Sequence, residues 1–191
     1  IDYFKSMSQK KNVLVIGGSG FIGSHLVDEL ISKKYKVSVL DIKKSKYHNK
    51  NAKFIKCSIQ NYKYLSKIIK KNKIIYHLAG ISDLNKAYSD ALGTAQLNFF
   101  TTIKILNYCV LYNVEKFIFA SSIYVNSTFG GFYKASKVAC ESYIQEFSKI
   151  HKLNYRILRY GSIYGSRADI SNGIYSILHN GKIQNKLVYK G

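Results

Sequence analysis

Residues 13–23 read Val-Leu-Val-Ile-Gly-Gly-Ser-Gly-Phe-Ile-Gly, an apolar run that ends in a glycine-rich turn. The glycines at positions 17, 20 and 23 directly follow a predicted strand and open a predicted helix. Gly17 permits a sharp turn, Gly20 lets the backbone approach a pyrophosphate, and Gly23 lets helix and strand pack tightly. The amide groups at the start of the helix attract phosphate. The pattern predicts a dinucleotide-binding turn, with a merely structural glycine turn as the alternative.

The rest of the chain alternates short apolar runs with stretches of helical period. Strands are expected at residues 13–16, 37–41, 53–56, 73–78, 116–120 and 155–158, and helices after residue 20 and at 61–71, about 95–112 and about 133–151. The 95–112 helix is expected to turn Leu97, Ile103, Leu106 and Val110 inward. This alternation is typical of a parallel sheet covered on both faces, connected by right-handed crossovers. The predicted fold class is α/β, a doubly wound parallel sheet of the Rossmann type.

An acidic residue ends the second predicted strand. Asp41 lies 18 residues past Gly23, where a carboxylate can accept hydrogen bonds from ribose hydroxyls. Because a carboxylate repels a 2′-phosphate, this position favours NAD over NADP. Lys43 and Lys44 follow closely and weaken that preference.

A tyrosine and a lysine stand four residues apart in Tyr133-Lys-Ala-Ser-Lys137, at the start of a predicted helix. Residues i and i+4 share one helix face, so the two head groups can enter one pocket. A nearby ammonium lowers the pKa of a phenol, which then serves as a general base near neutral pH. In a chain with 17 tyrosines and 30 lysines plus arginines, a chance pair is the alternative.

The composition argues against nucleic-acid, membrane and metal partners. The net charge of +20 is spread along the chain, which indicates a general lysine bias rather than a nucleic-acid site. No apolar run of about 18 residues exists, so no membrane span is expected. Three scattered cysteines without a C-x-x-C pair indicate a reduced, cytoplasmic setting and no metal site.

Taken together, these motifs resemble the extended short-chain dehydrogenase/reductases, specifically the NAD-dependent nucleotide-sugar epimerase/dehydratase group. The resemblance covers residues 12–191. It is carried by Gly17-x-x-Gly20-x-x-Gly23, Asp41, His77-Leu-Ala-Gly80, Asn98, Ser121-Ser122, Tyr133-x-x-x-Lys137 and Leu158-Arg-Tyr-Gly-Ser-Ile-Tyr-Gly165.

The resemblance implies roles for particular residues. The NAD-binding residues would be Gly17, Gly20, Phe21, Ile22, Gly23, Asp41, Ser58, Ile59, Leu78, Ala79, Gly80, Asn98, Tyr133, Lys137 and Gly161. Tyr133 would remove the proton of a sugar hydroxyl that Ser122 holds, so that Ser122, Tyr133 and Lys137 form the catalytic set. Ser122, Ser162 and Arg167 would contact a nucleotide-sugar substrate, although Arg167 also fits a solvated surface pair with Asp169. A homodimer paired through the two long helices is common in such proteins.

The departures from the family pattern select among its reactions. Ser58 replaces a usual Asp, Ser162 a frequent Asn, and Ser166 a usual proline, while Ser121 is an alternative to Ser122. The acidic pair that dehydratases carry after the catalytic Ser/Thr is replaced by Ile123 and Tyr124, and a decarboxylase's glutamate is also missing there. The resemblance therefore favours a UDP-glucose 4-epimerase-like reaction in polysaccharide synthesis. A sugar dehydrogenase or reductase and a non-catalytic dinucleotide-binding module are the alternatives.

The expected organisation has three parts. Residues 1–11 form a polar tail, residues 12–161 the NAD-binding domain, and residues 162–191 the start of an incomplete substrate lobe. Within the lobe, residues 172–178 are expected to be helical and residues 186–190 to form a strand. Because family members continue for well over a hundred residues, the chain is expected to be a truncated piece or a remnant.

Overall fold

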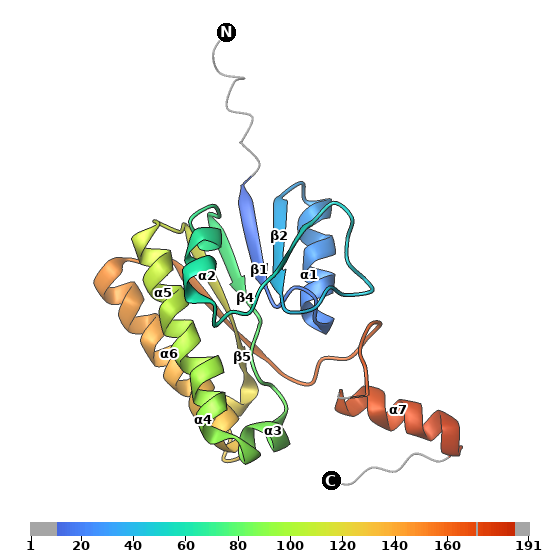
Figure 1. The fold of residues 1–191 in the computed structure, drawn as a ribbon. Coiled ribbons are helices and arrows are strands. Elements are labelled where there is room, and N and C mark those ends of the chain that lie inside the picture. Colours follow the sequence, from blue (N-terminus) through green and yellow to red (C-terminus); the bar gives the residue numbers. More distant parts are fainter. Residues whose placement is uncertain (1–10, 171, 186–191) are drawn as a thin grey trace. The chain divides into compact units, whose positions relative to one another are not determined.

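The computed structural model describes residues 11–170 and 172–185. Six strands form one sheet in the order β3-β2-β1-β4-β5-β6 (Figure 1). They are β1 (Asn12–Ile16), β2 (Lys36–Asp41), β3 (Lys53–Lys56), β4 (Ile74–His77), β5 (Lys116–Ser122) and β6 (Tyr155–Tyr160). β1 pairs in parallel with β2 and β4, and β3 and β5 continue the parallel pairing on either side. The predicted doubly wound parallel sheet is confirmed.

Helices cover both faces of the sheet. The described helices are α1 (Phe21–Ser32), α2 (Tyr62–Ile69), α3 (Leu84–Ser89), α4 (Ala91–Thr94), α5 (Thr101–Leu111), α6 (Gly131–His151) and α7 (Gly173–Gln184), with a π-helical segment, Ala95–Phe100, and a 3-10 segment, Ile123–Asn126. α1 packs on one face, and α2, α5 and α6 pack on the other (Figure 1). Among the described residues, no helix combines the length and the apolar character needed to cross a bilayer.

The central strand explains why an apolar run predicted a sheet of this kind. Leu14 and Ile16 pack into the core cluster that includes residues of α2, α5 and α6, whereas Val13 and Val15 pack into the cluster that includes residues of α1. All four side chains are fully buried. Alternate strand residues point to opposite faces, so a strand buried on both faces is apolar at every position.

The strand order reverses at β1, which places the predicted cofactor segments together. Ligands of open parallel sheets bind outside the carboxyl ends of the strands at such a reversal. The glycine turn follows β1, Asp41 ends β2, and residues 78–80 follow β4. Main-chain bonds join these segments: Gly17 N–H donates to the Leu40 carbonyl at 2.9 Å, and Ala79 N–H donates to the Ile16 carbonyl at 3.1 Å.

The inward face expected for the 95–112 helix is wrong in part. The residues that are buried in this segment are Asn98, Thr101, Thr102, Ile105, Leu106 and Cys109, so only Leu106 of the four expected residues is fully buried. Two causes combine. The buried threonines satisfy their hydroxyls internally, as Thr102 does on the Asn98 carbonyl at 2.5 Å, and the π-helical turn shifts the helical period.

The chain divides into two units, Ile1–Arg159 and Tyr160–Gly191, and the expected assignment of residues 12–161 to an NAD-binding domain and of residues 162–191 to a substrate lobe stays a prediction. In the second unit, the Asn172 side chain accepts the Tyr175 N–H at 3.0 Å, which caps α7, and donates to the Ile163 carbonyl at 2.6 Å. The helix expected at residues 172–178 is present and continues to Gln184. The strand expected at residues 186–190, and all of the expected N-terminal tail except Lys11, lie outside the described residues.

Candidate active site

The glycine turn is constrained at two of its three key positions. Gly17 has a φ of +83°, which favours glycine, and a Cβ there would lie 2.6 Å from the Ala79 nitrogen. A Cβ on Gly23 would lie 2.3 Å from the Gly17 carbonyl oxygen. At Gly20 a Cβ would make only an ordinary contact, 3.5 Å from the same oxygen. The fold itself therefore requires Gly17 and Gly23, whereas Gly20 leaves open space of the kind that a ligand can enter.

The start of α1 is suited to an anion. The helix begins at Phe21 behind Gly20, and no side chain of the described residues caps it. Helix-start amides without a partner carry a partial positive charge. The amides of Phe21 and Ile22 lie at this helix start, and their contact with a phosphate, which the family resemblance implies, stays a prediction.

Asp41 is oriented by the backbone around it. Its Oδ2 accepts the Ser19 N–H of the glycine turn at 3.0 Å, and its Oδ1 accepts the Ile42 N–H at 2.8 Å. Each carboxylate oxygen keeps a further lone pair, which can accept a ribose hydroxyl. The Asp41 carbonyl accepts the Cys57 N–H at 2.9 Å, which brings Ser58 to the same edge. Ser58 is exposed, whereas the Ile59 side chain packs into the core.

Asn98 fixes the segment that follows β4. Its Oδ1 accepts the Ile81 N–H at 2.8 Å, and its Nδ2 donates to the Ile81 carbonyl at 2.9 Å and to Ser136 Oγ at 3.1 Å. A Cβ on Gly80 would lie 2.8 Å from the Asn98 Oδ1. Both amide hydrogens of this buried side chain are thus used within the protein. Asn98 supports the predicted cofactor trough, and its direct contact with a cofactor stays a prediction.

The three predicted catalytic side chains come together at the carboxyl end of β5. Ser122 ends β5, and Tyr133 and Lys137 lie on the first turns of α6. The Ser122 hydroxyl interacts with the Tyr133 phenol and lowers its pKa in part. Lys137 Nζ lies 5.7 Å from the centre of the Tyr133 ring. All three side chains are buried, whereas a chance Tyr/Lys pair would be expected on the solvated surface.

Lys137 carries its amine into the protein interior. Nζ donates to the Ala120 carbonyl at 2.8 Å and lies 4.7 Å from the centre of the Phe119 ring. Burial lowers the pKa of Lys137 to about 8, although Cys140 and Glu141 raise it in part. The side chain is therefore an ammonium at neutral pH and loses its proton in mildly alkaline solution.

The expected pKa of Tyr133 needs correction. The Tyr/Lys spacing predicts a lowered value, but burial raises the pKa of Tyr133, and the hydrogen bond with Ser122 only partly offsets that rise. The neighbouring phenol of Tyr124, whose ring meets that of Tyr133 edge-on at 6.2 Å, raises it further. The prediction is wrong for the chain as described, because the Lys137 ammonium is bound to the Ala120 carbonyl and does not offset the burial.

The two serines that end β5 have different partners. Ser121 Oγ donates to Glu141 Oε1 at 2.5 Å, whereas Ser122 Oγ accepts the Tyr124 N–H at 3.3 Å and lowers the pKa of Tyr133. Neighbouring strand residues point to opposite sides, so only one of the two can face Tyr133. The structure favours Ser122. Sequence reasoning did not identify Glu141, although its position four residues after Lys137 on α6 is a usable signal.

We expect the Lys137→Met variant to be more stable than the wild type at pH 7. The pKa of Lys137 falls from 10.5 to about 8, and one unit is worth about 1.4 kcal/mol. Between these pH values the unfolded chain binds more protons, so this lysine makes the free energy of unfolding rise with pH. After loss of the bond to Ala120, the gain at pH 7 should be about 1–3 kcal/mol and should vanish toward pH 10.5.

Urea unfolding at pH 7 and pH 10 measures this gain. Lys149→Met is the matched control, because Lys149 lies on the same helix with an exposed ammonium. The control should change the unfolding free energy by less than about 0.5 kcal/mol. A Lys137→Met protein less stable than the wild type at pH 7 would contradict the buried-charge interpretation.

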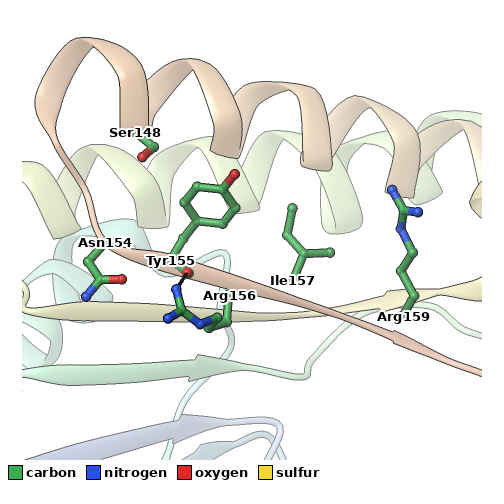
Figure 2. A pocket seen from close by; sticks show the side chains of 6 residues that line it. All are labelled: Ser148, Asn154, Tyr155, Arg156, Ile157 and Arg159. Atoms are coloured by element: carbon green, nitrogen blue, oxygen red, sulfur yellow. Dashed lines mark hydrogen bonds between the residues drawn. The ribbon is translucent and has the colours of Figure 1, made fainter.

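An open cavity of about 650 Å³ lies elsewhere, beside β6 and the end of α6 (Figure 2). It is lined by Ser148, Asn154, Tyr155, Arg156, Ile157 and Arg159. None of the predicted catalytic or cofactor residues is among them, so this cavity is separate from the candidate site.

The remaining predicted residues lie in the second unit. Gly161, Ser162 and Arg167 follow β6, and the turn after Tyr164 contains two residues with positive φ, Gly165 and Arg167. Their contacts with cofactor and substrate stay predictions. Within the described residues, His, Cys, Asp and Glu side chains form no group of three that could hold a metal ion.

Comparison with known proteins matches nearly the whole chain. The model of the NAD dependent epimerase/dehydratase family matches residues 13–189. A Methanocaldococcus jannaschii protein provisionally named UDP-glucose 4-epimerase is 30% identical over 91% of this chain and 64% of its own length. A UDP-N-acetyl-alpha-D-glucosaminuronate decarboxylase of Bacillus cytotoxicus is 30% identical over 83% of this chain and 56% of its own.

A solved structure also matches most of the chain. The crystal structure of Thermotoga maritima UDP-glucose 4-epimerase with UDP-glucose superposes with a TM-score of 0.83 at 28% identity. The match covers 92% of this chain and 64% of that one. The chain therefore spans less than two thirds of the length of these three relatives.

Proposed function

Because this chain belongs to the NAD-dependent epimerase/dehydratase family, we propose that it serves the 4-epimerisation of a nucleotide-diphosphate sugar, with Tyr133 as the base. The proposal rests on one observation above all. Ser122, Tyr133 and Lys137 are buried together at the edge of the sheet where the glycine turn also ends a strand. The similarity to proteins named UDP-glucose 4-epimerases supports the choice of reaction.

The residues at the sheet edge fit NAD. Gly20 leaves space beside the helix-start amides of Phe21 and Ile22, which would bind the diphosphate. Asp41 presents lone pairs to ribose hydroxyls and repels a 2′-phosphate. When bound, NAD⁺ supplies the hydride acceptor and a positive charge. The residues that bind NAD⁺ would fix its position at the sheet edge.

The proton is handled by this chain's own side chains. In the proposed reaction, the Tyr133 oxygen takes the proton of the sugar C4 hydroxyl as hydride leaves the same carbon, and gives it back when hydride returns to the opposite face. Ser122, whose hydroxyl interacts with Tyr133, would hold the sugar hydroxyl in line. Lys137 contributes a buried positive charge near the ring. Burial also excludes water, which strengthens these interactions.

The residues after Ser122 favour epimerisation over elimination of water. Loss of water from a sugar needs an acid to protonate the leaving hydroxyl and a base to take the neighbouring proton. Ile123 and Tyr124 supply no carboxyl group there. Alcohol–ketone interconversion needs only a base and a hydride acceptor. Tyr133 would supply the base, and NAD⁺ would accept the hydride.

The test is incubation of the full-length gene product with UDP-glucose, UDP-galactose and their N-acetyl forms, with NAD⁺ present. Interconversion of a sugar pair without net NADH is the expected result. NADH formed in proportion to the sugar consumed would instead identify a dehydrogenase. Binding of NAD⁺ without any conversion of these sugars would overturn the proposal and leave a binding module.

A further inference from the structure

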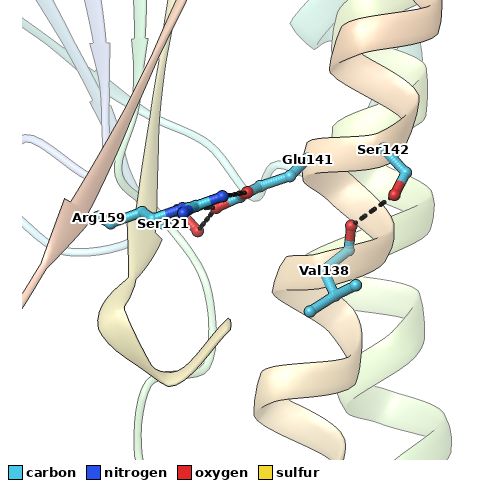
Figure 3. A network of polar contacts seen from close by, with 5 residues as sticks. All are labelled: Ser121, Val138, Glu141, Ser142 and Arg159. Atoms are coloured by element: carbon cyan, nitrogen blue, oxygen red, sulfur yellow. Dashed lines mark hydrogen bonds and ion pairs between the residues drawn. The ribbon is translucent and has the colours of Figure 1, made fainter. Parts of the chain in front are cut away.

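A buried polar network next to the candidate site joins α6 to β5 and β6 (Figure 3). Glu141, only 6% exposed, extends from α6 toward the sheet. Ser121 Oγ of β5 donates to its Oε1 at 2.5 Å. From β6, Arg159 Nε donates to the same oxygen at 3.1 Å, and Arg159 Nη2 donates to Oε2 at 2.7 Å. One carboxylate thus joins two strands to the helix.

The network explains why a carboxylate is tolerated at this depth. Burial alone raises the pKa of Glu141, but hydrogen bonds from Arg159 and Ser121, with the charges of Arg159 and Lys137, lower it below its ordinary value. A two-pronged arginine contact is among the strongest pairings of a carboxylate. Glu141 is therefore ionised and held in one orientation at neutral pH.

Two residues of the network are close in sequence to residues of the catalytic set. Ser121 precedes Ser122, so the bond that fixes Ser121 also fixes the side on which Ser122 emerges. Glu141 lies four residues after Lys137, on the same face of α6. The carboxylate thus has a geometric link to the strand end and to the helix of the site.

Among the described residues that raise the pKa of Lys137, Glu141 is the one that carries a negative charge. From β4, burial and the Lys137 charge lower the pKa of His77 to about 3, so the ring is neutral. From α6, burial raises the pKa of the Cys140 thiol to about 11, and the pKa of Tyr133 is raised as well. From β5, Lys137 meets the Ala120 carbonyl and the Phe119 ring.

We propose that Glu141 is a positioning residue of the Ser122–Tyr133–Lys137 site: clamped by Ser121 and Arg159, it holds the end of β5 against α6 and keeps the buried Lys137 as an ammonium. The consequence for turnover rests on the proposed function. The clamp and the protonation of Lys137 are properties of the chain that can be measured without any substrate.

The test compares Glu141→Gln with Glu146→Gln. Both remove one negative charge from α6, but Glu146 is exposed and pairs with Lys149. The readout is the pH midpoint of the Lys137 ¹³Cε signal, assigned by its loss in Lys137→Met. The midpoint should fall by about one pH unit in Glu141→Gln and stay unchanged in Glu146→Gln. An unchanged midpoint in folded Glu141→Gln would overturn the proposal.

A second variant keeps the test decisive where Glu141→Gln does not fold. Arg159→Gln removes a side chain that is 44% exposed and leaves Glu141 charged. Its loss removes a competing cation, so the Lys137 midpoint should rise rather than fall. A purely structural clamp would not move the midpoint in opposite directions in the two variants. A fall in Arg159→Gln would likewise refute the assigned role.

The activity arm separates this inference from the proposed function. If the wild type is active, the alkaline limb of the kcat–pH profile should shift to lower pH by about one unit in Glu141→Gln. The KM for the sugar should stay nearly unchanged. If the wild type converts no sugar, the proposed function is wrong. The titration of Lys137 then still tests the role assigned to Glu141. If conversion is observed and neither the midpoint nor the alkaline limb moves, the clamp fails alone.

Discussion

Tyr133→Phe should lower turnover by roughly 10²- to 10⁴-fold, the usual contribution of a general base, while NAD⁺ binding changes little. The substitution deletes only the phenol oxygen, and the ring keeps its packing against Tyr124. The oxygen lost is the one that interacts with Ser122 and would take the substrate proton. Single-turnover assays with the sugar pair that the wild type interconverts, together with NAD⁺ titration, measure both quantities.

Tyr143→Phe is the matched control for this prediction. Tyr143 lies on the same helix with a partly exposed ring, packed edge-on against Phe99 at 5.0 Å. Turnover in the control should stay within about twofold of the wild type, because Tyr143 is not part of the Ser122–Tyr133–Lys137 set. If Tyr133→Phe kept more than a tenth of wild-type turnover, the base would have to be another group.

Gly23→Ala and Gly20→Ala should separate folding from cofactor binding at the same turn. A methyl group on Gly23 would meet backbone atoms at 2.3 Å and 2.7 Å, which the turn cannot relieve by rotating a side chain. We expect a loss of more than about 3 kcal/mol of unfolding free energy, or a fall in Tm of about 10 °C. Gly20→Ala meets only an ordinary contact and should keep the wild-type Tm within a few degrees.

The effect of Gly20→Ala should appear in NAD⁺ affinity instead. A methyl group in the space beside the helix-start amides would keep a diphosphate at a distance, at a cost of about tenfold or more in Kd. Thermal unfolding and NAD⁺ titration of both variants test the pair, with Gly173→Ala as a control because nothing lies within 4 Å of its Cβ position. Equal NAD⁺ affinity in Gly20→Ala and the wild type would remove the turn as a diphosphate site.

The polar interior of the fold was the part that sequence patterns predicted least well. Apolar spacing gave the inward face of the 95–112 segment only in part: Leu106 is buried and Leu97 packs against the core, but the spacing did not predict the burial of Asn98, Thr101 and Thr102, whose side chains are bonded internally. For the same reason Glu141 was missed, since a glutamate on a helix is ordinarily read as solvent-exposed. Only the arrangement of Ser121 and Arg159 around it shows that this carboxylate belongs inside.

The primary structure by itself determined the parallel sheet, the glycine turn, Asp41 at the end of β2 and the Tyr133/Lys137 pair. Each of these is encoded within a few consecutive residues, through strand burial, the steric needs of glycine or helical spacing. The tertiary structure decided which serine faces Tyr133, how Asn98 is used and in which direction the pKa of Tyr133 moves. These depend on the depth of burial and on partners distant in the chain, as when the Lys137 amine binds the Ala120 carbonyl and leaves the desolvation of the phenol uncompensated.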